Sequence, residues 1–298
     1  MIRDWRWAIA SVAPIYRQRY NPLMPELPEV ETIARMLRVG STTHPPVPGR
    51  TIDGVPLRWP RHIATPGAPR FRREILGRTI RDVSRRGKYL VFPLDQGTML
   101  IHLKMSGDLA LLPTGSPVGP YDHTVFHLDG GWDLRFGDAR KFGKVFLVDD
   151  PNAVLTGLGP EPLAAGFTAR TLAGRLHGHA RALKPLLLDQ TFVAGLGNIY
   201  ADEALHRARL HPLRRSNSLT PAEVQRLWRG MRAALRAGLR HNGASIDWVY
   251  RGGEYQNHFR VYQREGRPCP VCRPPVRRIV VGQRGTHYCP SCQRRRRP

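Results

Sequence analysis

Four cysteines near the carboxyl end constrain the fold of this chain more than any other feature of its sequence. They are Cys269, Cys272, Cys289 and Cys292, arranged as two C-x2-C pairs with sixteen residues between them, and there is no other cysteine. Two such pairs bring four thiolates to one point with the tetrahedral geometry that Zn²⁺ prefers, so the pattern predicts one structural zinc ion. The alternative is two disulfides in a secreted protein, which residues 5–16 disfavour because Arg6 and Pro14 interrupt them, unlike a signal peptide.

The charge of the chain points to a polyanionic partner. The 298 residues carry a formal net charge of +24, and residues 207–298 hold 21 Arg, no Lys and four acids, a balance of +17. A hydrophobic fraction of 41% is enough for buried cores, and the length suggests two domains, so a disordered basic tail cannot be the whole protein. No apolar run approaches the 18 residues of a bilayer span. With aromatic residues available for stacking, nucleic acid fits better than an anionic membrane.

The amino-terminal half predicts one helix followed by a β-rich region. Apolar residues recur with helical spacing over 29–39, after Pro28 and before Gly40. Residues 41–70 are rich in Pro, Gly and Thr, which indicates loop with short extended pieces. Short strand-like runs separated by turns follow at 87–94, 98–104, 108–112, 123–128, 132–136 and 144–148. They predict an antiparallel sandwich.

Residues beyond 149 predict a linker, a helical block and a zinc-bound hairpin. Residues 149–166 are rich in Pro and Gly, as in a linker. The clearest helix opens with a capping box from Thr220 to Glu223, with a proline inside its first turn. Residues 277–288 read as two strands around a turn at 282–285, with Arg284 at its tip. That guanidinium suits a phosphate contact, although one more solvated Arg is the alternative.

Seven blocks of the sequence resemble the formamidopyrimidine-DNA glycosylase family. Besides the cysteines they are MPELPEVET (24–32), RRGKYL (85–90), HLKMSG (102–107), DARKFG (138–143), LGPEPL (158–163) and GLGNIYADE (195–203). The resemblance implies an α+β multi-domain fold, in which an N-terminal antiparallel β-sandwich with flanking helices precedes a helix-two-turn-helix module and a C4 zinc finger. The expected segments are an extension (1–24), the catalytic sandwich domain (25–150), a linker (151–166), the helix-two-turn-helix domain (167–260), and the hairpin with its basic tail (261–298).

The resemblance implies that Pro25 is the nucleophile. In this family an N-terminal proline, exposed when the initiator Met is removed, attacks C1′ of the damaged nucleotide, expels the base and forms an iminium that drives elimination of both phosphates. The amine must be unprotonated, which a helix N-terminus favours. As printed, Pro25 is an internal imide. We therefore interpret residues 1–24 as a mis-assigned start or a removed extension; an inactive chain is the alternative.

Further site residues follow from the same resemblance. Glu26 is implied to shuttle protons, Lys88 to donate a proton beside a phosphate, and Arg284 to serve the δ-elimination. The residues implied to position phosphates are Lys184, Asn198 and Tyr200. From the sequence alone, Glu26 is a helix-dipole partner, Lys88 is a solvent-facing strand residue, and core packing is as good an account of Tyr200.

Three residues match those that this family inserts into the duplex when the damaged base is extruded. Met105 is the plug, Arg140 meets the orphaned base and Phe142 is the wedge. Without the family, Met105 and Phe142 would be assigned to the core. Residues 251–260 occupy the place of the loop that covers an extruded 8-oxoguanine. Lys104 stands where the family commonly has Gly.

The sequence therefore predicts a bifunctional glycosylase and AP lyase that removes oxidised purines from damaged double-stranded DNA. An endonuclease VIII-like enzyme for oxidised pyrimidines and a non-catalytic zinc DNA-binding protein are the alternatives. We expect one structural Zn²⁺ and no redox cofactor or nucleotide. We also expect a monomer that does not bind membranes and lies in the bacterial cytoplasm with the nucleoid.

Overall fold

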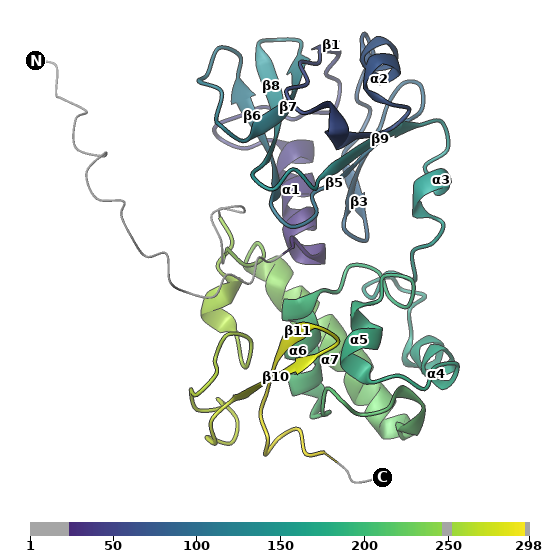
Figure 1. Ribbon diagram of the computed structural model, residues 1–298, viewed down its shortest axis with the longest axis vertical. Coiled ribbons are helices and arrows are strands. Elements are labelled where there is room, and N and C mark those ends of the chain that lie inside the picture. The colour runs from purple at the N-terminus through teal and green to yellow at the C-terminus, as the bar shows by residue number, and fades with distance from the viewer. Residues whose placement is uncertain (1–23, 246–251, 296–298) are drawn as a thin grey trace, which may run out of the picture.

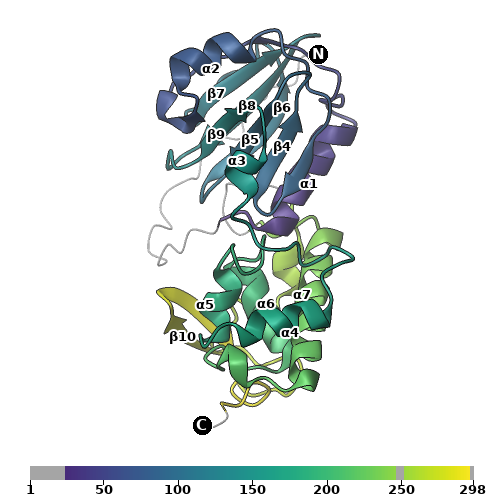
Figure 2. The ribbon, with the colours of Figure 1, turned by 90° about the vertical axis from the view of Figure 1, so that its right-hand side faces the viewer.

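The computed structural model describes residues 24–245 and 252–295. The chain forms two bodies stacked along its long axis, a β-rich body above and a helical body that carries a small hairpin below (Figures 1 and 2). Within the described residues, no helix combines the length and apolar character needed to cross a membrane. The arrangement agrees with the mixed α+β fold expected from the sequence.

Two sheets and two helices make up the upper body. The helices are α1 (Leu27–Val39) and α2 (Ala68–Ile75), with a 3-10 turn η1 (Pro60–His62). The four-stranded sheet has the order β1 (Ile52–Gly54), β7 (Asp122–Leu128), β8 (Trp132–Asp138), β6 (Gly107–Pro113). The five-stranded sheet has the order β2 (Ile63–Thr65), β9 (Lys144–Val148), β5 (Thr98–His102), β4 (Tyr89–Pro93), β3 (Ser84–Arg86). Their inner faces and α1 enclose one apolar core.

The upper body differs from the sequence prediction in three details. Strand β2 runs parallel to β9, so the sandwich is not purely antiparallel. Helix α2 was not predicted, because only Phe71 and Ile75 of its eight residues are buried, too few for a readable period. Strand β3 was missed because all three of its residues are half-buried and give no alternation.

The lower body contains the helical block and the cysteine module. Its helices are α4 (Ala169–His177), α5 (Leu183–Leu188), α6 (Asn198–Ala208) and α7 (Pro221–Arg240), with 3-10 turns η2 (Ser216–Ser218) and η3 (Tyr255–His258). The short helix α3 (Asn152–Leu155) precedes them and lies beside the upper body (Figures 1 and 2). Strands β10 (Arg277–Val281) and β11 (Arg284–Tyr288) form the hairpin. The capping box at Thr220 and Glu223 opens α7 as predicted. Gly230 permits close packing, since a Cβ there would lie 2.7 Å from the Ala204 carbonyl oxygen on α6.

The two bodies meet at the first turn of α1. Three clusters of buried apolar residues follow the chain in the expected order, but Leu27 belongs to the helical cluster rather than to the sandwich. The Leu27 amide donates to the Gly195 carbonyl, 2.9 Å away. The segment that opens α1 is therefore built into the lower body, and the side chains beside it lie at the junction.

Candidate active site and nucleic-acid interface

Glu26 lies at the N-terminal ends of two helices. It precedes α1, and its carboxylate accepts backbone hydrogen bonds from the start of α6: Gly197 at 2.7 Å and Ile199 at 2.8 Å. The helix dipole favours a negative charge at this position. Glu26 is 1% exposed, and a Cβ at Gly197 would overlap its carboxylate. Glu26 thus lies where a helix-dipole partner would, and the second helix is about 170 residues away in the sequence.

A second carboxylate from α1 also enters the lower body. Glu29 accepts hydrogen bonds from the Ala244 amide at 2.7 Å, the Tyr200 hydroxyl at 2.8 Å and the Glu26 amide at 2.9 Å. Burial raises the pKa of Glu29. Tyr200 is fully buried and its ring stacks on Tyr255 at 5.3 Å. Tyr200 thus supports the junction and offers no exposed hydroxyl to a phosphate.

Lys88 and Arg284 bring positive charge to the same place. Lys88 lies in the two-residue turn between β3 and β4 rather than in a strand, and only 7% of it is exposed. Burial lowers the pKa of Lys88; the charges of Glu26 and Glu29 oppose this shift, whereas that of Arg284 adds to it. Arg284 is exposed; Gly282 and Gln283 form the turn, so Arg284 is the first residue of β11 beside the turn rather than at its tip.

The Glu26 carboxyl can exchange a proton near neutral pH. Burial raises its pKa to about 7, against the lowering effect of the Lys88 charge and the backbone donors of α6. A group whose pKa lies near the ambient pH serves both as proton donor and as proton acceptor. Pro25 is the preceding residue and is also buried. The junction thus combines the Glu26 carboxyl, the buried amine of Lys88 and the exposed guanidinium of Arg284.

The four cysteines form the metal site that their spacing predicts. Their sulfur atoms all lie within 4.8 Å of one another, and neighbouring pairs are 3.3–3.9 Å apart. Four sulfurs around a zinc ion at 2.3 Å would be about 3.8 Å apart, whereas a disulfide needs about 2.05 Å. The set therefore fits one structural Zn²⁺ and not two disulfides. The hairpin β10–β11 starts and ends beside these cysteines, so the zinc ion fixes the position of Arg284.

Lys184 and Asn198 hold the zinc hairpin to the helical block. Lys184 is fully buried; its ammonium donates to the Asn198 carbonyl at 2.8 Å and to Asp202 at 2.6 Å. Asp202 in turn accepts the His287 amide of β11 at 2.8 Å, and the Asn198 side chain donates to the Gly285 carbonyl at 3.0 Å. The Lys184 ammonium thus has protein partners where the sequence predicted a phosphate. Asp202 is a residue that sequence reasoning missed, although its i, i+4 spacing from Asn198 is a readable signal.

Met105, Arg140 and Phe142 lie together on the sandwich. A guanidinium nitrogen of Arg140 is 3.6 Å from the Met105 sulfur, and the guanidinium carbon is 4.9 Å from the centre of the Phe142 ring. Phe142 is 48% exposed, which excludes the core role that its side chain alone would suggest. Residue 102 pairs with residue 89 across β5 and β4, so the loop that carries Met105 starts beside the Lys88 turn.

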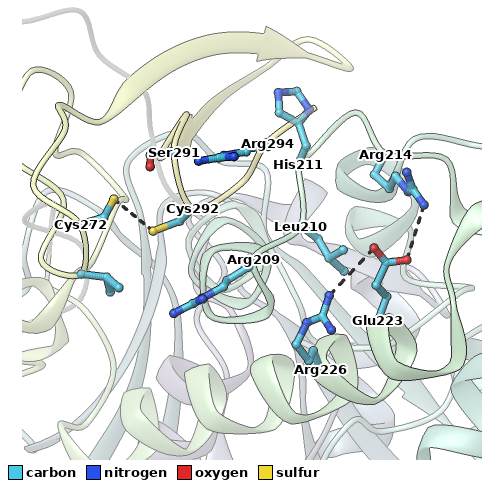
Figure 3. A pocket seen from close by; sticks show the side chains of 11 residues that line it. Arg209, Leu210, His211, Arg214, Glu223, Arg226, Cys272, Ser291, Cys292 and Arg294 are labelled. Atoms are coloured by element: carbon cyan, nitrogen blue, oxygen red, sulfur yellow. Dashed lines mark hydrogen bonds and ion pairs between the residues drawn. The ribbon is translucent and has the colours of Figure 1, made fainter. Parts of the chain in front are cut away.

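A basic pocket lies at the other end of α6 from Asn198. Figure 3 shows it between the C-terminal end of α6, the first turns of α7 and the cysteine module, with a volume of about 590 Å³. Glu223 is 3.5 Å from a guanidinium nitrogen of Arg214 and 4.0 Å from one of Arg226. An eleven-residue helix is about 16 Å long, so this cavity is separate from the Glu26 junction.

Part of the expected lesion-covering segment lies outside the described residues. Arg251 belongs to that part, whereas Tyr255 in η3 is fully buried against the helical core. The segment 252–260 is anchored at its end, because one oxygen of Glu203 accepts the amides of residues 260, 261 and 262 at 2.9–3.1 Å. Glu203 had no assigned role from the sequence.

A buried acid between a β-sandwich and a helical body with a zinc site, close to an exposed guanidinium, fits the class of DNA glycosylases. Three family models match in order: the formamidopyrimidine-DNA glycosylase N-terminal domain over 24–145, its H2TH domain over 158–249, and the zinc finger found in FPG and IleRS over 266–295. The chain belongs to the formamidopyrimidine-DNA glycosylase family.

Similar proteins support this membership along most of the chain. A formamidopyrimidine-DNA glycosylase of Roseiflexus sp. is 46% identical over 91% of this chain and 100% of its own length. The enzyme of Symbiobacterium thermophilum is 45% identical over 91% of this chain and 89% of its own. The Lactococcus lactis Fpg, solved with an abasic site containing DNA, superposes with a TM-score of 0.84 at 34% identity, covering 91% of this chain and all of that one.

Proposed function

We propose that this protein removes oxidised purines, 8-oxoguanine and formamidopyrimidines, from double-stranded DNA and then cleaves the strand by β,δ-elimination. The observation that carries the proposal is the position of Glu26. It is the residue after Pro25, it is buried, and its pKa is raised to about 7. A proton donor and acceptor beside an amine nucleophile is what Schiff-base chemistry at C1′ needs.

The reaction requires the nitrogen of Pro25 to be a free secondary amine. The amine forms a bond to C1′ as the bond between C1′ and the base breaks, and the base leaves with a proton. The nitrogen then loses its proton, the bond between C1′ and O4′ breaks as O4′ takes up a proton, and an iminium forms at C1′. Loss of a C2′ proton from this iminium eliminates the 3′ phosphate, and loss of a C4′ proton in a second elimination releases the 5′ phosphate. An internal imide nitrogen cannot begin this sequence. The active chain is therefore one that begins at Pro25, in agreement with the family model, which starts at residue 24.

Glu26 and Lys88 exchange the protons of these steps, and Arg284 holds the phosphates at the scission site. Burial favours the neutral amine of Lys88, which makes it a competent proton carrier at the junction. Asn198, Lys184 and Tyr200 act through the residues they hold: Asn198 through the Gly285 carbonyl of the hairpin, Lys184 through Asp202, and Tyr200 through Glu29. Met105, Arg140 and Phe142 fill the space that the extruded nucleotide leaves.

The lesion class is supported by a related protein. The Lactococcus lactis Fpg has been solved with N7-Benzyl-Fapy-dG containing DNA and also with an oxidized pyrimidine containing DNA. The second complex keeps oxidised pyrimidines as a second candidate substrate for this chain. Competing excision of 8-oxoguanine opposite cytosine and of thymine glycol by one enzyme preparation separates the two; faster release of thymine glycol would overturn the purine assignment.

Borohydride trapping tests the chemistry itself. A chain that begins at Pro25 should form a covalent adduct with abasic-site DNA, and the adduct should be lost in Pro25→Gly but kept in Gly174→Ala, an exposed control far from the junction. The full 298-residue chain should form none. Failure of the Pro25-started chain to form an adduct would favour a non-catalytic zinc DNA-binding protein.

The proposal extends to organisation and place of action. The protein acts as a monomer that does not bind membranes, in the bacterial cytoplasm at the nucleoid. Its units are the sandwich domain 25–150, the linker 151–166, the helix-two-turn-helix domain 167–260 and the zinc hairpin with its tail 261–298. Limited proteolysis should cut first within 151–166, and light scattering should give the mass of one chain.

A further inference from the structure

The loops that present the three inserted side chains share an unusual backbone conformation. One loop joins β5 to β6 and carries Met105, and the other joins β8 to β9 and carries Arg140 and Phe142. Each contains a lysine in the left-handed region: Lys104 has φ of 55° and Lys141 has φ of 60°. Residues with a side chain rarely adopt this conformation, and it persists only where the surroundings impose it. Each strained lysine is the immediate neighbour of an inserted residue.

A buried carboxylate supplies those surroundings. Asp138, the last residue of β8, is fully buried and accepts the amides of Arg140 at 3.2 Å and Gly143 at 2.6 Å, so it holds both ends of its own loop. The Ser106 hydroxyl donates a short hydrogen bond to the same carboxylate. The Ser106 oxygen also accepts the Arg140 amide at 3.0 Å. Asp138 and Ser106 thereby fasten the Met105 loop to the Arg140 loop.

A third segment, which includes Arg61 and His62, also contacts Asp138 and Lys144. The fully buried ring of His62 in η1 lies with one nitrogen 3.7 Å from the Asp138 carboxylate and the other 3.1 Å from the Thr124 hydroxyl. The Lys144 ammonium donates to the Arg61 carbonyl at 2.7 Å. These contacts give part of the long segment 41–70 a definite structural role, which its composition did not suggest.

We propose that Asp138 and Ser106 are positioning residues that hold the two loops as a single rigid wedge and thereby control the base-extrusion step. The proposal rests on the proposed function and adds to it a device that contacts neither the damaged nucleotide nor the nucleophile. The plug, the guanidinium and the aromatic ring must enter the duplex together, and a group held loosely is inserted less efficiently. Loosening the fastening should therefore slow extrusion while leaving the chemistry at C1′ intact.

The test compares Ser106→Ala with a matched variant on the same pair of strands. Strand β6 is bounded by two hydroxyl residues that each donate to an aspartate of β8: Ser106 to Asp138 at one end, and Thr114 to Asp133, 3.0 Å away, at the other. Thr114→Ala removes the equivalent hydrogen bond far from the wedge. Both variants are made in the Pro25-started chain, and their thermal unfolding is measured to match their stability.

Two readouts separate extrusion from chemistry. Single-turnover excision of 8-oxoguanine from a duplex requires extrusion, whereas cleavage of an abasic site in a single strand does not. Ser106→Ala should excise 8-oxoguanine at least about tenfold more slowly, as expected for loss of one charge-assisted hydrogen bond. It should cleave the single-stranded abasic site within about twofold of the unaltered chain. Thr114→Ala should match the unaltered chain on both substrates.

A direct probe of insertion keeps this inference distinct from the proposed function. The fluorescence of 2-aminopurine beside a tetrahydrofuran site rises when the neighbouring stack is opened, and it needs no bond cleavage. Ser106→Ala should slow this rise, and Asp138→Asn should slow it too. If Ser106→Ala inserts as fast as Thr114→Ala, or if it slows both substrates equally, the positioning role is wrong. If the unaltered chain inserts but cleaves nothing, the proposed function fails instead.

Discussion

Replacing Lys184 tests whether this lysine contacts a phosphate, as the resemblance implies, or neutralises the buried Asp202, as the structure indicates. In Lys184→Met the apolar part of the side chain stays, but Asp202 loses the ammonium at 2.6 Å and keeps only its contacts with His287. Both members of the pair are fully buried. Removing one partner of such a pair costs about 3–5 kcal/mol, because an uncompensated charge is left inside the protein. For a cooperative unit of about 150–250 residues that corresponds to a fall of about 6–20 °C in Tm.

A double variant shows whether the charge is the cause. In Lys184→Met/Asp202→Asn no buried charge remains, and the asparagine oxygen can still accept the His287 amide. We expect at least about 2 kcal/mol of the loss to be recovered, measured by urea unfolding. If Lys184→Met alone lies within about 1 kcal/mol of the unaltered chain, or if the double variant is no more stable than the single, the burial argument is wrong.

The salt dependence of DNA binding distinguishes support from direct contact. Each phosphate contact contributes about −0.9 to the slope of log affinity against log salt concentration. Arg284→Met should reduce the magnitude of the slope by about 0.9, because the exposed guanidinium is a proposed phosphate contact. Lys184→Met should weaken binding without changing the slope. A reduction of about 0.9 for Lys184→Met would restore the phosphate contact expected from the sequence.

Three further predictions concern the junction and the zinc module. Because the pKa of Glu26 is raised to about 7, the folded state binds more protons than the unfolded state between about pH 4.5 and pH 7. The free energy of unfolding should therefore fall as the pH rises through this window and then level off. Urea unfolding at several pH values should show a smaller fall for Glu26→Gln. Cys272→Ser or chelation should release zinc, measured by mass spectrometry, and should abolish lesion-DNA binding, since the two C-x2-C pairs that flank the hairpin would no longer be joined through the metal. Gly197→Ala should displace the Glu26 carboxylate and lower abasic-site cleavage at least about tenfold, whereas Gly174→Ala in α4, where a Cβ has free space, should raise stability by about 0.5–1 kcal/mol.

The sequence predicted well those features whose cause is local. The capping box of α7, the short strand runs between turns that became β4 to β9, and the β10–β11 hairpin all depend on residues within a few positions of one another. The zinc site is equally local, because ligand chemistry and loop length restrict how two C-x2-C pairs can close. The same patterns failed where few residues carried them, as in α2 and β3.

The roles of site residues needed more than local pattern. The resemblance placed Glu26, Lys88, Met105, Arg140 and Phe142, and the structure brings the last three together on an exposed surface. The resemblance assigned no role to Asp138, Ser106 or Asp202. Their importance lies in contacts between segments that are far apart in the sequence. Such residues are recognisable only when their partners are known.

The sequence by itself determined the metal site, the order of the structural units and the family to which the chain belongs. Only the tertiary structure decided which charged groups are buried: Glu26 beneath the start of α6, Lys184 against Asp202, and Asp138 behind the wedge. The physical reason is that the energy of a charged or polar group depends on the water it loses and the donors that replace it. Those donors come from segments tens to hundreds of residues away, so folding sets the proton affinity of the carboxylate on which the chemistry depends.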